Sequence, residues 1–339
     1  MHKIRRGLDG AAVDTVHWGL LSTANINRKL IPAIWASQRG QLNAVASRDQ
    51  VKATEYAREW DIPNAFGSYE EMIASDKVDA VYIGLPNHLH AEWSVKAMQA
   101  GKHVLCEKPF ALSMAEVDSM IEASQKYQRV LAEAFMYRHH PQTKIAGDWV
   151  RDGKVGEPIL IRGVFNFKLT EQDNVRRIQE FGGGCLWDVG VYPMSFAQYI
   201  FGGPPVHVQG YQMLGETGID ELFSGQLIYP SGGIAQISSS FISPYHTHLE
   251  IIGTEGRLVL TRPFNALEEG RQMTFTSPQG DELEIPVPEV ELYSGEVLDL
   301  NDAILDGTPT YLTLAETRDH VHTLLALYES AHTGKKISL

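Results

Sequence analysis

Short apolar runs alternate with helix-like segments from Val16 to Phe135, and this alternation is the strongest constraint on the fold. The expected strands are Val16–Leu21, Leu42–Ala46, Ala80–Leu85, His103–Cys106 and Val130–Ala134. Apolar residues recur at helical spacing in Ile26–Trp35, Val51–Trp60, Tyr69–Ser75, His88–Ala100 and Met114–Tyr127. Short buried strands separated by helices are typical of βαβ units. We therefore predict an α/β domain with a doubly wound parallel sheet of the Rossmann type.

The pattern changes after about residue 140, where strand-like runs follow one another without helices between them. After a helix at Thr143–Arg151, the expected strands are Ile159–Phe167, Val206–Met213, Leu222–Tyr229, Ile234–Phe241, Leu249–Ile252 and Arg257–Thr261. Two helical patterns, Val297–Leu305 and Leu314–Ala331, close the chain. Consecutive strands predict a large, mostly antiparallel open sheet in an α+β domain. We expect an arm at 1–15, the Rossmann domain at 16–138 and the α+β domain at 139–339, and leave open whether the last helix packs on the Rossmann domain.

Length and charge limit the classes of function. A chain of 339 residues suits two domains. Its 29 basic and 42 acidic residues give a net charge of −13, which opposes binding to nucleic acid. No apolar run approaches the roughly eighteen residues of a membrane span, and the first fifteen residues lack the apolar core of a signal peptide. Two cysteines are too few for a disulfide framework, so we predict a cytoplasmic protein. From its charge and the lack of a long apolar run, we predict that it binds neither nucleic acid nor membrane.

The turn after the first expected strand is a candidate pyrophosphate site. A G-x-G-x-x-G motif at this point lets the backbone approach a dinucleotide, and here Ser22, Ala24 and Asn27 occupy the three glycine positions. Serine and alanine are the next smallest residues, whereas asparagine departs from the pattern. The predicted cofactor contacts are Ser22, Thr23, Ala24, Asn25 and Ile26. An ordinary strand–turn–helix explains this turn equally well.

The end of the second expected strand indicates which dinucleotide is bound. An NAD site usually has an acidic residue there for the ribose 2′-hydroxyl, and this chain has Ser47 and Arg48, with Lys52 one turn later. A hydroxyl and a guanidinium suit a 2′-phosphate. We therefore predict NADP in preference to NAD. The alternative is an ordinary solvated arginine.

Three further motifs carry a family resemblance. They are Leu85-Pro86-Asn87-His88-Leu89-His90, Cys106-Glu107-Lys108-Pro109, and Gly182-Gly183-Gly184 followed by Asp188-Val189-Gly190-Val191-Tyr192. Together with the order of the expected elements, they resemble the glucose–fructose oxidoreductase, inositol dehydrogenase and MocA-like family over nearly the whole chain from about residue 16. The Glu-Lys-Pro tripeptide at the end of a Rossmann strand is the most specific part.

The resemblance implies roles for several residues. Lys108 corresponds to the lysine beside the nicotinamide and the reacting oxygen, and Asp188 to the downstream aspartate. Tyr192 stands where many members have histidine, which resembles the branch of glucose–fructose oxidoreductase, dimeric dihydrodiol dehydrogenase and D-xylose dehydrogenases. The remaining implied cofactor residues are Leu85, Asn87, His90 and Glu107, and Arg176 is implied on the substrate side. A helix cap at Asn87, an ordinary histidine at 90 and a solvated Arg176 are the alternatives.

These residue types suit the oxidation of an alcohol. Tyrosine has a pKa of about 10, and a nearby ammonium such as that of Lys108 favours the phenolate. We hypothesise that Tyr192 transfers the proton, Lys108 tunes it and binds the oxygen, and Asp188 positions the substrate. Pro193 predicts a bend, or the start of the regular helix, beside Tyr192. No metal is predicted, because His246 and His248 share a strand face without an evident third ligand.

The predicted function is an NADP-dependent oxidoreductase of a pyranose sugar or related cyclic polyol. An aldose such as D-xylose or D-glucose would be oxidised to its lactone. The alternatives are a trans-dihydrodiol dehydrogenase, a sugar–sugar oxidoreductase with tightly bound NADP, and an NADP-binding regulatory sensor without turnover. The resemblance also implies a homodimer or homotetramer formed through the second domain's sheet.

Overall fold

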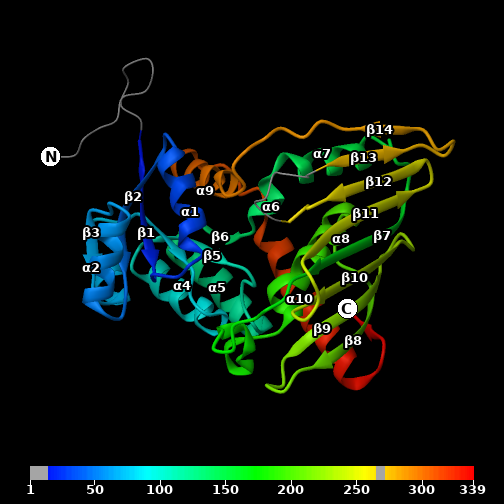
Figure 1. Ribbon diagram of the computed structural model, residues 1–339. Coiled ribbons are helices and arrows are strands. Elements are labelled where there is room, and N and C mark those ends of the chain that lie inside the picture. The colour runs from blue at the N-terminus through cyan, green and yellow to red at the C-terminus, as the bar shows by residue number, and fades with distance from the viewer. Residues whose placement is uncertain (1–13, 265–271) are drawn as a thin grey trace, which may run out of the picture. The chain divides into compact units, whose positions relative to one another are not determined.

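A computed structural model of the chain describes residues 14–264 and 272–339 (Figure 1). The expected arm at 1–15 lies outside the described residues except for its last two positions. The chain forms two compact units. The first contains residues 14–111, Ala115–Met136 and Tyr293–Leu314, and the second contains Leu112–Met114, Tyr137–Leu292 and Ala315–Leu339.

The first unit is built on a six-stranded parallel sheet with the order β3-β2-β1-β4-β5-β6. Its strands are β1 (Val16–Leu21), β2 (Gly40–Ala46), β3 (Asn64–Phe66), β4 (Ala80–Ile83), β5 (His103–Glu107) and β6 (Leu131–Ala134). The predicted doubly wound sheet is confirmed. Strand β3 was not predicted, because three residues are too few to show a strand period.

Helices α1 (Asn27–Ala36), α2 (Gln50–Glu59), α3 (Tyr69–Ala74), α4 (His90–Gln99), α5 (Met114–Tyr127) and the short helix η1 (Asn87–Leu89) connect these strands. Helix α9 (Ser294–Asp306) belongs to the same unit, although it comes late in the chain. The Trp18 indole donates to Asn301 Oδ1 at 3.0 Å, and Arg39 pairs with Asp302 at 2.5 Å. The expected continuous second domain at 139–339 is therefore interrupted at residues 293–314.

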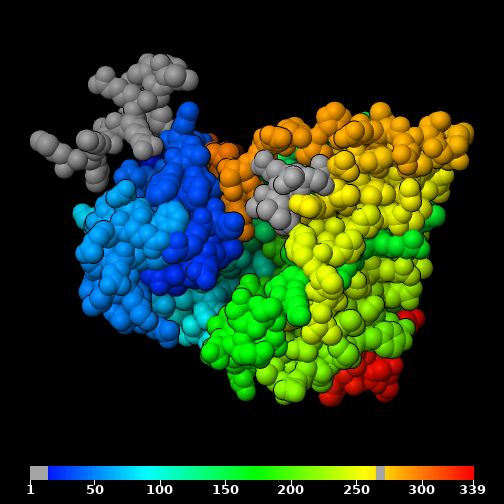
Figure 2. Space-filling view, in the orientation of Figure 1, coloured from blue at the N-terminus to red at the C-terminus, as the bar shows by residue number. Residues whose placement is uncertain are grey.

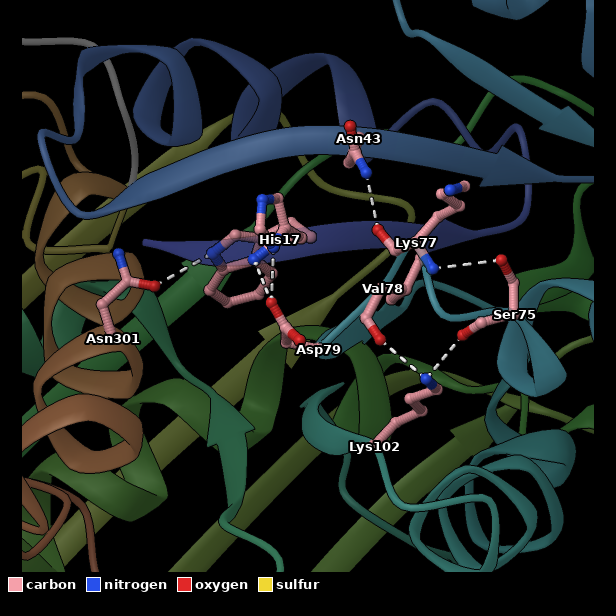
Figure 3. A network of polar contacts seen from close by, with 9 residues as sticks. His17, Asn43, Ser75, Lys77, Val78, Asp79, Lys102 and Asn301 are labelled. Atoms are coloured by element: carbon pink, nitrogen blue, oxygen red, sulfur yellow. Dashed lines mark hydrogen bonds and ion pairs between the residues drawn. The ribbon is translucent and has the colours of Figure 1, made fainter. Parts of the chain in front are cut away.

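Polar contacts close the amino ends of the parallel strands (Figure 3). The backbone N–H and ring Nδ1 of His17 lie 2.9 and 2.7 Å from Asp79 Oδ2. The Lys102 ammonium donates to the carbonyl oxygens of Ser75 and Val78, both at 2.7 Å. Ligands of open α/β sheets bind outside the opposite, carboxyl ends of the strands, where the sequence motifs lie.

The second unit contains a nine-stranded sheet with the order β14-β13-β12-β11-β7-β10-β9-β8-β15. The strands are β7 (Pro158–Asn166), β8 (His207–Leu214), β9 (Asp220–Ile228), β10 (Ile234–Ser240), β11 (His246–Gly253), β12 (Gly256–Thr261), β13 (Met273–Thr276), β14 (Glu282–Glu284) and β15 (Ile337–Ser338). Strands β7 and β10 pair in parallel, and all other neighbours pair antiparallel. The predicted mostly antiparallel sheet is confirmed.

Helices cover one face of this sheet (Figure 1). They include α7 (Pro141–Arg151), α8 (Val191–Phe201) and α10 (Leu314–Thr333), with the short α6 (Met136–His139) preceding α7. Helix α8 approaches β7 closely, since a Cβ on Gly163 would lie 2.5 Å from the Pro193 Cβ. Helix α10 packs on β9 in the same way, because a Cβ on Gly225 would lie 3.0 Å from Leu327. Among the described residues, no helix has both the length and the apolar character needed to cross a membrane.

Candidate active site

The turn after β1 holds one non-glycine residue in a backbone conformation that favours glycine. Ser22 has a φ of 132°, in the region that favours glycine. Its hydroxyl donates to the carbonyl oxygen of Gly84 at 3.2 Å and accepts from the Ala24 N–H at 3.2 Å. These bonds help to hold a conformation that costs a non-glycine residue about 1–3 kcal/mol. Serine thus occupies a position at which the motif's glycine is expected for conformational reasons.

Asn27 fits at the third glycine position because the neighbouring strand supplies the space. Asn27 is fully buried, and its side-chain amide donates to the Ser22 carbonyl oxygen at 2.7 Å. A Cβ on Gly84, just after β4, would lie 3.0 Å from Ile26 Cγ2 and 3.2 Å from Asn27 Oδ1. The close approach of α1 to the sheet therefore depends on Gly84. The altered motif is compatible with a bound dinucleotide.

The segment after β2 presents basic side chains. Asp49 caps α2, accepting the Val51 and Lys52 N–H groups on Oδ1 at 2.8 and 3.3 Å. The Ser47 hydroxyl is buried and accepts from the Asp49 N–H at 3.3 Å. Arg48 and Lys52 are exposed. Burial raises the pKa of the Tyr69 hydroxyl, and the charge of the adjacent Arg48 opposes that rise. The acidic residue of this segment, Asp49, therefore caps α2, and the exposed cations Arg48 and Lys52 lie near it in the chain.

His90 connects two of the motif segments from inside the protein. Its side chain is fully buried, with Nδ1 2.9 Å from the Pro109 carbonyl oxygen and Nε2 2.8 Å from that of Leu85. Burial lowers the pKa of His90 and keeps the ring neutral. This placement favours support of the two loops over the cofactor contact that we predicted. Asn87 lies at the start of η1, one turn before the ring.

Glu107 and Lys108 end β5. The Glu107 carboxylate accepts from the Tyr82 hydroxyl on β4 with one oxygen and from the Lys108 backbone N–H at 3.2 Å with the other. Removal of this carboxyl from water raises its pKa, which the Lys108 charge and the Tyr82 hydrogen bond oppose. The peptide bond between Lys108 and Pro109 is cis. Because both of its carboxylate oxygens accept from protein donors, the Glu107 side chain is directed at protein groups, whereas the sequence predicted a contact with the cofactor.

Asp188 and Tyr192 lie in one continuous segment with two helix types. Asp188 falls in a π-helical turn, Leu186–Gly190, and Tyr192 follows in the first turn of α8. Pro193 also lies in this first turn, where it has no N–H to donate to the carbonyl oxygens of the preceding π turn. The irregularity predicted near Pro193 is thus a π turn before the helix, and the regular helix begins at Val191.

Arg176 and Asp188 form an ion pair in the second unit. The Arg176 Nε donates to Asp188 Oδ2 at 2.6 Å, with 43% of the arginine side chain exposed and 13% of the aspartate side chain. The adjacent Arg177 has a different role. It pairs with Glu221 at 2.8 Å and donates to the Leu169 carbonyl oxygen at 2.7 Å. Arg177 thus anchors the loop, while Arg176 meets Asp188.

The glycine run before Asp188 permits a close packing that side chains would block. A Cβ on Gly183 would lie 2.5 Å from the Arg176 carbonyl oxygen, and one on Gly184 would lie 2.0 Å from Asp220 Oδ1. The Gly184 N–H also donates to the Arg176 carbonyl oxygen at 3.0 Å. The glycines therefore bring the loop of Arg176 next to the segment that carries Asp188.

Asp220, which sequence reasoning missed, holds the start of the π turn. It is 2% exposed, and its Oδ2 accepts from the Leu186 N–H at 2.7 Å and from Cys185 Sγ at 3.1 Å. Its Oδ1 accepts from the Tyr328 hydroxyl at 2.8 Å. Burial raises the pKa of Asp220, and these donors oppose the rise. A lone acidic residue at the start of a strand gave no signal in the sequence.

Aromatic rings surround Tyr192, which is 4% exposed. The ring centroids of Phe165, Phe264 and Tyr137 lie 5.3, 5.5 and 5.6 Å from its own. The Tyr137 hydroxyl lies 2.6 Å from the Ser195 hydroxyl on α8. The Tyr192 ring is therefore held on three sides, which limits its rotamers.

The described residues contain no group of three or more histidine, cysteine, aspartate or glutamate side chains placed to hold a metal ion. His246 and His248 stack with their centroids 6.1 Å apart. Cys106 and Cys185 are free and buried, and burial raises the pKa of both thiols, which disfavours the nucleophilic thiolate.

Each of the two units matches a known protein family. Residues 16–135 match the family described as "Oxidoreductase family, NAD-binding Rossmann fold", and residues 144–259 match the GFO/IDH/MocA C-terminal domain. The chain is 35% identical over 324 residues to D-xylose 1-dehydrogenase (NADP(+)) 2 of Haloferax volcanii, covering 95% of this chain and 99% of that protein. It is 32% identical to trans-1,2-dihydrobenzene-1,2-diol dehydrogenase of Xenopus laevis, covering 78% and 82% of the two chains.

A similar solved structure is the aldose-aldose oxidoreductase from Caulobacter crescentus complexed with glycerol. It has a TM-score of 0.89 and 25% identity, and the match covers 96% of this chain and all of that one. Matches of this extent, to both domain families and to full-length relatives, establish that the chain belongs to the GFO/IDH/MocA family of oxidoreductases.

Proposed function

We propose that this protein is an NADP-dependent dehydrogenase of a pyranose sugar or related cyclic polyol. An aldose such as D-xylose or D-glucose would be oxidised at C1 to its lactone. The observation that carries the proposal is the Arg176–Asp188 pair on the segment that leads to Tyr192. A carboxylate fixed in this way can accept hydrogen bonds from substrate hydroxyls. Similarity to a D-xylose dehydrogenase over 95% of the chain supports this substrate class.

The residues at the carboxyl end of the first sheet fit NADP. The Ser22–Ile26 turn would hold the pyrophosphate, and Ser47, Arg48 and Lys52 would hold the 2′-phosphate. Leu85, Asn87 and Lys108 would lie on the nicotinamide side. The Ser22 backbone conformation and the small Gly84 support this assignment, because both allow a close approach of backbone at this turn. When bound, NADP⁺ supplies the acceptor for the hydride.

In the proposed reaction, the substrate C–H bond breaks with its electron pair and the adjacent hydroxyl loses its proton. Tyr192, as the phenolate, takes this proton. The Lys108 ammonium favours the phenolate and binds the substrate oxygen. Asp188 positions the substrate, and Arg176 keeps the Asp188 carboxylate oriented. A positioned acid–base group of this kind typically contributes about 10²–10⁴-fold in rate.

Absorbance at 340 nm with NADP⁺ and a panel of aldoses, inositols and cyclic trans-diols tests the proposal. We expect NADP⁺ to be reduced when an aldose is present, and NAD⁺ to be reduced more slowly with the same aldose. Turnover of trans-diols alone would instead identify a dihydrodiol dehydrogenase, for which the Xenopus relative is a precedent. Binding of NADP⁺ without turnover of any compound would contradict the proposal. Nucleotide retained in the purified protein would then point to a sugar–sugar oxidoreductase, and exchangeable nucleotide to a sensor.

We also propose that the protein assembles as a homodimer or homotetramer through the uncovered face of the nine-stranded sheet (Figure 2). Tyr211, Met213 and Leu222 lie on this face and are 64%, 45% and 37% exposed. Beside them is a hollow of about 440 Å³ whose lining includes Arg162 and Gln236. Sedimentation of wild type and Tyr211→Lys tests this proposal, with Val51→Lys in the first unit as the exposed control. A wild-type monomer would contradict it.

The expected cytoplasmic location is part of the same proposal. The unpaired state of both cysteines supports a reducing compartment. Fractionation of cells that express the protein, beside a cytoplasmic marker enzyme, tests this location.

A further inference from the structure

A tyrosine hydroxyl lies inside the first unit, where the proposed reaction does not use it. Tyr82 is on the central strand β4 and has no exposed surface. It pairs with Leu105 on β5, so Glu107, two residues further, lies on the same face of the sheet. The Tyr82 hydroxyl donates to Glu107 Oε1. Burial raises the pKa of Tyr82 well above its usual value, so Tyr82 remains a donor at any working pH.

Glu107 transmits this contact to the backbone of Lys108. Its second oxygen, Oε2, accepts from the Lys108 N–H at 3.2 Å. A continuous path therefore leads from the phenol in the sheet, through one carboxylate, to the residue before Pro109. The charged and titratable groups that face this path are Lys108 itself, Glu133 on β6, Glu296 on α9, and Tyr293 just before α9.

We propose that Tyr82 is a positioning residue for Lys108, acting through the Glu107 carboxylate. This inference rests on the proposed function, in which Lys108 binds the reacting oxygen. A carboxylate held by two donors has a defined orientation, whereas one that has lost a donor can rotate about its side-chain bonds. The hydrogen bond from Tyr82 also favours the charged form of Glu107, which is the stronger acceptor for the Lys108 N–H.

Replacement of one hydroxyl tests the role of Tyr82. Tyr82→Phe keeps the ring and removes the donor, and we expect kcat to fall about tenfold, the loss typical of a hydrogen bond to a charged group. We expect the KM for the sugar and the dissociation constant of NADPH to change less than threefold, since Tyr82 has no exposed surface for a ligand to contact. Tyr229→Phe is the matched control, because the Tyr229 hydroxyl is also buried and has no hydrogen-bond partner among the described residues. We expect its kcat to stay within twofold of the wild type.

A double-mutant cycle with Glu107→Gln separates positioning from packing. If Tyr82 acts through Glu107, then Tyr82→Phe has little further effect on kcat when Glu107→Gln is already present. Equal effects of Tyr82→Phe in both backgrounds would overturn the proposal, as would an unchanged kcat in the single variant.

Amide hydrogen exchange provides a readout that does not need turnover. We expect faster exchange in peptides that contain the Lys108 N–H in Tyr82→Phe and in Glu107→Gln, and unchanged exchange there in Tyr229→Phe. If the wild type oxidises none of the compounds in the panel, the proposed function fails. The exchange data then still decide whether Tyr82 holds Lys108, and unchanged exchange in Tyr82→Phe would show that it does not.

Discussion

The Nε atom of Arg176 lies 2.6 Å from Oδ2 of Asp188, and Asp188 is the less exposed of the two side chains. A guanidinium that holds one carboxylate oxygen leaves the other oxygen in a defined direction. The two residues are twelve apart in the chain, and the glycine run between them allows their loops to touch. The pair therefore links the predicted substrate residue Arg176 to the predicted site residue Asp188.

Arg176→Met should weaken binding of the sugar. Loss of a hydrogen bond to a charged group corresponds to about 1.5–3 kcal/mol, so kcat/KM should fall by roughly ten- to a hundredfold. Steady-state kinetics with the sugar as the varied substrate measure this effect. Arg151→Met is the control, because Arg151 forms a surface pair with Asp148 in which both side chains are more than half exposed. Equal kinetics for Arg176→Met and the control would exclude a substrate role for Arg176.

Tyr192→Phe should abolish most turnover without unfolding the protein. The ring packs among Phe165, Phe264 and Tyr137, and phenylalanine preserves those contacts. We expect kcat to fall by about 10²–10⁴-fold. Thermal unfolding and NADPH binding should match the wild type. Near-normal turnover would show that another group transfers the proton.

Arg48→Ala should reduce the preference for NADP⁺. Arginine presents donors in a geometry that suits phosphate, so the KM for NADP⁺ should rise by roughly ten- to a hundredfold while the KM for NAD⁺ changes little. Arg58→Ala, an exposed arginine in the last turn of α2, is the control. A similar loss with both cofactors would mean that Arg48 supports the fold and does not read the 2′-phosphate.

Asp220→Asn should destabilise the protein and slow the reaction together. The amide can no longer accept from the Leu186 N–H, the Cys185 thiol and the Tyr328 hydroxyl at once. An unmet buried group costs about 1–3 kcal/mol in the free energy of unfolding. Urea unfolding and kcat/KM measure the two effects. Tyr328→Phe removes only one donor and should reduce both quantities less, and a larger effect of Tyr328→Phe would argue against Asp220 as the anchor.

Two histidines, the buried His139 and the half-buried His103, should make the protein less stable in mild acid. Burial lowers the pKa of His103 to about 4 and that of His139 to about 3, from a usual value of 6.5. Below pH 6.5 the unfolded chain binds protons at these positions and the folded protein does not, so the free energy of unfolding falls as the pH drops toward 4. Urea unfolding at pH 7 and pH 5 measures this fall.

A variant identifies the contribution of His103. Its Nδ1 accepts the Val130 N–H at 2.9 Å, so His103→Asn can retain an acceptor without titrating. We expect a smaller difference between the two pH values in this variant. An unchanged difference would assign the acid sensitivity to other groups.

The sequence alone determined the succession of elements and the class of both sheets. Strand and helix periods are properties of a few neighbouring residues, so the strand Val16–Leu21 and the helix Met114–Tyr127 were predicted with their observed bounds. Strands β3, β14 and β15 were missed, because two or three residues contain too little of a period. Strand β13 was missed because its four residues alternate with threonine, whereas the equally short β4 is a fully buried apolar run. The Glu-Lys-Pro and triple-glycine motifs also indicated the family without any structure.

Only the tertiary structure decided which side chains meet. Trp18 and Asn301 are 283 residues apart, and their hydrogen bond joins α9 to the first unit. The expected domain boundary had placed α9 in the second domain. Leu186 and Asp220 are 34 apart, and Tyr82 and Glu107 are 25 apart. Sequence periodicity relates only residues within one strand or helix. Contacts between residues so distant in the chain depend instead on how whole strands and helices pack. The sequence thus determined where chemistry-bearing residues lie along the chain, whereas packing decided which of them are held by Asp220, Tyr82 and His90.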